Sequence, residues 1–73
     1  MERDVVKATT RDYFVQTLRR IADAVEQGEA FRIQIAGTRL TVPADADLSV
    51  EHEASEGAHE IEMQLCWTDG DDT

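Results

Sequence analysis

The feature that most limits how this chain can fold is an unbroken alternation of apolar and polar residues near its C-terminal end, from His59 to Trp67. Successive side chains of a β-strand point to opposite faces, so this stretch predicts an amphipathic strand. Its apolar face carries His59, Ile61, Met63, Leu65 and Trp67. Such a face is normally buried against another element, so the rest of the chain is expected to supply a cover.

The expected cover is an amphipathic helix over residues 11–27. Its apolar stripe consists of Phe14, Leu18, Ile21 and Val25, widened by Val15 and Ala22. The spacings of four, three and four residues are those of one helix face. Arg20 lies off this stripe and is expected in water.

Signals for the start and the end of a helix flank this segment. Thr9 or Thr10 can supply the N-cap oxygen, and Asp12 stands three residues after Thr9, in the position of a capping-box partner. Gly28 is placed to end the helix in the left-handed conformation that glycine adopts easily.

Two hairpins are predicted after the helix. In the first, a turn at Gly37-Thr38 would pair Ile35 with Leu40 and Ile33 with Val42. Pro43 is expected to stop its second strand, because proline lacks the amide donor of a continuing ladder.

The second hairpin is predicted from the alternation of Leu48, Val50 and His52 and from the turn Glu56-Gly57 before the last strand. Val50 would then face Met63, and Leu48 would face Leu65, which keeps the apolar side continuous.

These elements predict a single α+β domain over residues 9–68, with one helix packed on one face of a four-stranded antiparallel meander. Residues 1–8 are expected to form an N-terminal arm or a short edge strand, and residues 69–73 a disordered acidic tail. On the polar face, Arg32 and Arg39 of the first hairpin would attract glutamates of the second.

Charge limits the possible partners. The 73 residues include 7 Lys and Arg against 16 Asp and Glu, a net charge of −9. Such a chain repels nucleic-acid phosphates and anionic lipid, so neither is expected as a partner. Because molar salt shortens the Debye length to about 3 Å and screens carboxylate repulsion, this composition predicts a halophilic source. The alternative is an ordinary acidic bacterial domain.

Three further observations predict the cellular compartment of the protein. There is no apolar run long enough to span a bilayer, no signal-peptide pattern at the start, and a single cysteine, Cys66. These observations predict a soluble protein in the reducing cytoplasm.

The sequence resembles the amphi-Trp domain family of small proteins, frequent in halophilic archaea. The matching stretches are Leu18 to Gly28, Ile33 to Gly37, Leu40 to Pro43, and the amphipathic strand Glu60 to Cys66 with Trp67 after it. The resemblance covers the chain from about Thr10 onward. It implies a fold and no catalytic residue.

Few residues suggest chemistry. His52 and His59 would share a sheet face near the second turn, where Glu56 or a water could complete a metal site, but no third strong ligand converges. We therefore predict no metal, no cofactor and no catalytic residue. Cys66 on the polar face and Trp67 at the end of the core are the candidate interaction residues.

The resulting functional prediction is a non-catalytic interaction or assembly module that binds a protein partner or a second copy of itself through an open sheet edge or the Trp67 end. One alternative is an acidic mimic of a polyanion that occupies a basic protein. A second alternative is a protein that weakly binds a metal or another ligand.

Overall fold

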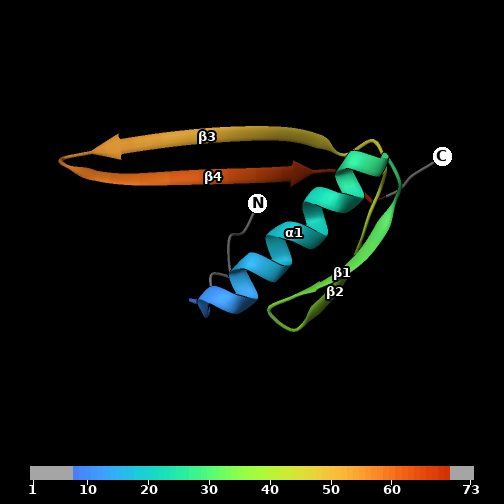
Figure 1. Ribbon diagram of the computed structural model, residues 1–73. Coiled ribbons are helices and arrows are strands. Elements are labelled where there is room, and N and C mark those ends of the chain that lie inside the picture. Colours follow the sequence, from blue (N-terminus) through green and yellow to red (C-terminus); the bar gives the residue numbers. More distant parts are fainter. Residues whose placement is uncertain (1–7, 70–73) are drawn as a thin grey trace.

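The structure is a computed structural model and describes residues 8–69. Its elements are α1 (Arg11–Gln27), β1 (Phe31–Ile35), β2 (Thr38–Val42), β3 (Asp47–Ser55) and β4 (Ala58–Cys66). The strands form two antiparallel hairpins in two separate two-stranded sheets, β1–β2 and β3–β4 (Figure 1). The order of one helix and four strands was predicted, whereas the prediction of a single meander is wrong. The expected arm or strand at residues 1–8 and the tail at 69–73 lie almost wholly outside the described residues.

The helix has the predicted bounds, and the structure decides between the two candidate caps. Thr10 is the N-cap, and its hydroxyl accepts a hydrogen bond from the Tyr13 amide at 3.1 Å. The third residue after this cap is Tyr13 and not Asp12, so the predicted capping box does not form. Gly28, at φ 69°, ends the helix in the predicted left-handed conformation.

The first hairpin turns one residue earlier than predicted. Its turn residues are Ala36 and Gly37, at φ 50° and 85°. Positive φ at both positions matches the right-handed twist of the flanking strands. Ile33 therefore pairs with Leu40, and Phe31 with Val42, which corrects the predicted pairings of Ile35 with Leu40 and Ile33 with Val42. A shift of two residues keeps every side chain on its face, so the predicted apolar face survives the error.

The second hairpin forms as predicted. Val50 faces Met63 and Leu48 faces Leu65 across the ladder. The turn is at Glu56 and Gly57, at φ 52° and 86°.

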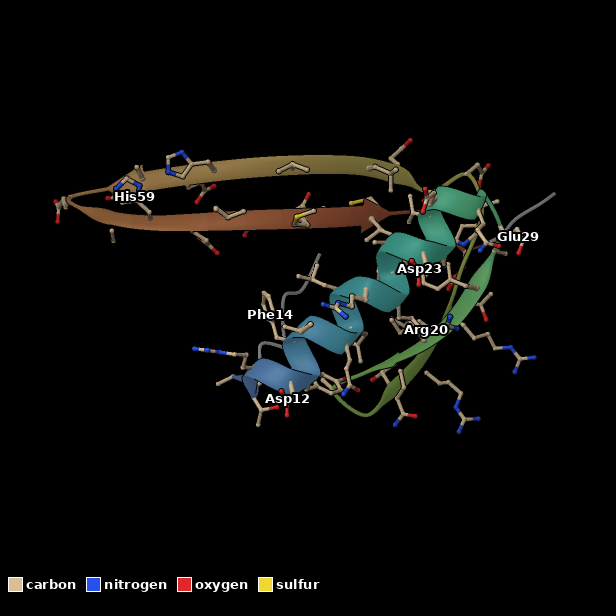
Figure 2. All side chains as sticks on the ribbon, viewed as in Figure 1. Asp12, Phe14, Arg20, Asp23, Glu29 and His59 are labelled. Carbon is tan, nitrogen blue, oxygen red and sulfur yellow. The ribbon has the colours of Figure 1, made fainter. Side chains whose placement is uncertain are left out.

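The helix lies on the first hairpin. The Tyr13 hydroxyl donates to the Gln34 carbonyl at 3.2 Å, and the Arg20 guanidinium donates to the Arg32 carbonyl at 2.6 Å. Arg20 also lies over the Phe31 ring, 5.9 Å from its centroid. Arg20 is exposed, as expected, and its long side chain also reaches β1 along the helix flank (Figure 2).

The core is small and sits where the two hairpins meet. Val42 is 4% exposed and is the one large side chain of residues 8–69 that is buried. A cavity of about 80 Å³ beside it is lined by Val25 and Phe31 on one side and by Leu48 and Leu65 on the other. This junction is the place where the base of the second hairpin joins the rest of the fold.

Beyond the junction the second hairpin projects away from the helix (Figure 1). A turn between Pro43 and Ala46, closed by a bond from the Ala46 amide to the Pro43 carbonyl at 3.3 Å, separates β2 from β3. The molecule measures 44 × 27 × 24 Å, with a radius of gyration of 13.8 Å. A compact domain of this length would have about 11 Å. The chain therefore adopts an extended form with much of its apolar surface uncovered.

Candidate interaction surface

The apolar face of the second hairpin is exposed. Its central residues are Leu48 and Val50 on β3 and Ile61 and Met63 on β4, which we call the hairpin row. Val50 is 70% exposed and Ile61 is 74% exposed. The prediction that the helix covers this face is wrong, because α1 is held on the first hairpin and the second hairpin diverges from it.

The helix exposes apolar side chains as well. Phe14 is 56% exposed, and Leu18 and Val15 are also exposed. The flank that carries Tyr13 and Arg20 is bonded to β1, which turns the Phe14 side of the helix away from that hairpin. Figure 2 shows Phe14 on the side of α1 toward the β3–β4 hairpin. We call Phe14 and Leu18 the helix pair.

A groove of about 1000 Å³ separates the helix pair from Ile61 and Met63. Its lining comes from the start of the helix, the tip of the first hairpin and β4: Ala8, Thr9, Thr10, Tyr13, Phe14, Thr17, Leu18, Ile21, Gln34, Ile35, Ala36, Gly37, Ile61 and Met63. All of these residues are uncharged in a chain whose net charge is −9. The described lining of the groove is therefore uncharged and mostly apolar in an acidic molecule.

The opposite face of the second hairpin is acidic. Glu51 pairs with Glu62, and Glu53 pairs with Glu60. Like charges directly opposite each other destabilise a hairpin unless they are screened. Gln64 donates to the Glu62 carboxylate at 3.4 Å, and this bond partly offsets the repulsion between carboxylates at that end of the face.

The charge pairing expected between the two hairpins is absent from the described sheets. Arg32 pairs with Thr41, and Arg39 pairs with Gln34, in a sheet that does not include β3 or β4. The arginines consequently have no glutamate as a cross-strand neighbour in that sheet.

The two histidines come together as predicted, on the apolar face near the second turn. His52 Nε2 and His59 Nδ1 are 2.9 Å apart, and the rings are stacked with centroids 5.1 Å apart. One ring donates and the other accepts, so the bond uses a lone pair that a metal ion would need. Within residues 8–69 no three His, Cys, Asp or Glu side chains converge to hold a metal ion.

Cys66 and Trp67, the two candidate interaction residues, lie at the end of β4. Cys66 is exposed and pairs with Asp47, a carboxylate, whereas a reactive thiolate is stabilised by a cation. Trp67 follows the last ladder pair and is half-buried. Neither residue lines the groove, so their role in interaction stays a prediction.

Sequence reasoning did not find the groove. The available signal was that the chain has fewer covering surfaces than faces to cover. One helix has a single apolar stripe, whereas two hairpins present two apolar faces. If the hairpins formed one sheet, the stripe could cover both faces. Since they form two sheets, one face remains open.

The chain was compared with family profiles, curated proteins and solved structures, and its helix was compared with membrane-spanning helices. The sequence profile of the Amphi-Trp domain matches residues 3–73. Comparisons with curated proteins and with solved structures found no match. Among the described residues, no helix has the length and apolarity required to cross a membrane.

Proposed function

This chain belongs to the Amphi-Trp domain family, and we propose from that premise that it is a non-catalytic module that binds a protein partner through the hairpin row and the groove. The observation that carries the proposal is the exposure of Val50 and Ile61, at 70% and 74%, on one face of a regular hairpin. Soluble monomers rarely leave contiguous apolar patches uncovered, and patches of this kind mark interaction sites.

The composition of the groove supports binding over catalysis. General acid–base chemistry requires titratable groups in a dry pocket that shifts their protonation. Among residues 8–69, those that line the groove are uncharged, and the Tyr13 phenol is bonded to the Gln34 carbonyl. Apolar surface with few polar groups suits the core of a protein interface.

Photo-crosslinking in an extract of the native host tests this proposal. A photoreactive phenylalanine analogue at Val50 is expected to give covalent adducts larger than the 8.2 kDa chain. The matched control places the same analogue at Ser49, one residue away on the opposite face of β3, where we expect few adducts. Equal adduct yields from the two positions, or none from either, would contradict the proposal.

The acidic face supports a second candidate function, mimicry of a polyanion. The pairing of Glu51 with Glu62 and of Glu53 with Glu60 gathers four carboxylates on one face of the hairpin. A basic protein could bind such a face as it binds phosphates. Release of duplex DNA from a basic DNA-binding protein by the wild-type chain, but not by the Glu51→Gln/Glu53→Gln variant, is the result that this candidate requires.

A further inference from the structure

We propose that the partner of the hairpin row is a second copy of this chain, in a two-fold dimer in which the row of each copy packs against the helix pair of the other. This inference rests on the proposed function and names its partner. The contact would join Val50, Ile61 and Met63 of one copy to Phe14 and Leu18 of its mate, and the reverse.

The exposed area is of the size that a dimer would bury. The accessible surface is 6445 Å², whereas a folded monomer of 8.2 kDa has about 4500 Å². Residues 1–7 and 70–73 can account for at most the surface of an extended chain. After this maximum is subtracted, the accessible surface left for residues 8–69 still exceeds that of a folded monomer of their mass by about 600 Å². Each partner of a standard interface contributes about 800 Å². The surplus of accessible surface thus approaches the area that one partner contributes to a stable interface.

One chain carries both halves of the contact. Ile61 and Met63 of the hairpin row line the same groove as the helix pair, and both apolar surfaces are exposed. In a two-fold dimer a contact from the first surface to the second occurs twice, so a single arrangement covers both surfaces in both copies. A partner of another sequence would need to supply two such surfaces.

Charge and extent are compatible with this partner. Two chains of net charge −9 repel each other, but the described residues that line the groove are uncharged, and so are those of the hairpin row and the helix pair, so no carboxylate is among the residues of the proposed contact. The apolar surface continues past the groove to Leu48 and Val50, which do not line it. A small apolar ligand in the groove would leave these two residues uncovered, whereas a second protein surface would cover them.

Sedimentation equilibrium of the purified chain in 2 M potassium chloride gives the first test. We expect a species of twice 8.2 kDa at micromolar concentration. Val50→Glu should weaken association at least about 30-fold, the effect of losing one central interface side chain. Ser49→Glu adds the same charge one residue away on the other face and should leave association unchanged. Circular dichroism of each variant checks that it still folds.

Crosslinking between isotopically distinct copies gives the second test. A photoreactive analogue at Ile61 of ¹⁵N-labelled chain, mixed with unlabelled chain, should label the peptide around Phe14 and Leu18 of the unlabelled copy. Adducts confined to one copy, whether on its own helix or on its own residues 1–7, would overturn the proposal. A monomer in purified form that crosslinks to a different protein in the host extract would also overturn it, while leaving the proposed function intact. A monomer without adducts in either setting would contradict both.

Discussion

Two residues, Thr10 and Gly28, decide where the helix begins and ends. The Thr10 hydroxyl satisfies the Tyr13 amide, one of the donors that a helix leaves unpaired at its start. We expect Thr10→Ala to lower the free energy of unfolding by about 1 kcal/mol. Thr9→Ala is the matched control and should have little effect. Urea unfolding monitored by circular dichroism compares them, and equal losses would contradict the assignment of the cap.

Trp67 is the residue that the family name emphasises. It is half-buried just beyond the last pair of β4. If it closes the end of the core, Trp67→Ala should lower the free energy of unfolding by about 2–3 kcal/mol, and Trp67→Phe by less. Urea unfolding measured together with sedimentation distinguishes the alternatives. A variant that keeps its stability but loses association would place Trp67 in the interface.

At the scale of elements, local signals were sufficient for the helix and the second hairpin. Cap residues and the helical spacing of apolar residues gave the bounds of α1, and alternation with the turn at Glu56-Gly57 gave the register of β3 and β4. The predicted register of the first hairpin was wrong by two residues, because Ala36 takes a positive φ that sequence preferences assign to glycine or asparagine.

The arrangement of the elements could not be predicted in the same way. Alternation shows that a strand has an apolar face but not which neighbour covers it. The direction of the second hairpin depends on the turn at Pro43 to Ala46, and the orientation of the helix depends on bonds from Tyr13 and Arg20 to carbonyls of β1. The groove, which results from these contacts, was therefore missed.

The attachment of α1 to β1 makes a prediction about Arg20. Its guanidinium donates to the Arg32 carbonyl and lies over the Phe31 ring. We expect Arg20→Met to lower the free energy of unfolding by about 1–2 kcal/mol. Arg19→Met removes the same charge at the neighbouring position and should change stability by only a few tenths of a kcal/mol. Chemical unfolding of the two variants provides the comparison, and a smaller effect at Arg20 than at Arg19 would contradict this account.

At the scale of the whole molecule, charge predicts a response to salt. The net charge is −9, and two glutamate pairs face each other across the second hairpin. Screening of this repulsion should raise the melting temperature by at least about 5 °C between dilute buffer and 2 M potassium chloride. The Glu51→Gln/Glu53→Gln variant should have a higher melting temperature than the wild-type chain in dilute buffer. Its melting temperature should also rise less when salt is added. Equal melting temperatures of the wild-type chain in both solutions would rule out adaptation to high salt.

The central claim is that the hairpin row is a binding surface, covered when the molecule assembles. The most direct measurement is the broadening of the Ile61 and Met63 methyl NMR signals by a soluble paramagnetic probe, recorded over a range of protein concentrations. We predict strong broadening in the dilute monomer, where both side chains are exposed, and protection as the dimer forms. Equal broadening at every concentration would contradict the dimer, whereas protection already present in the dilute monomer would contradict the binding surface itself.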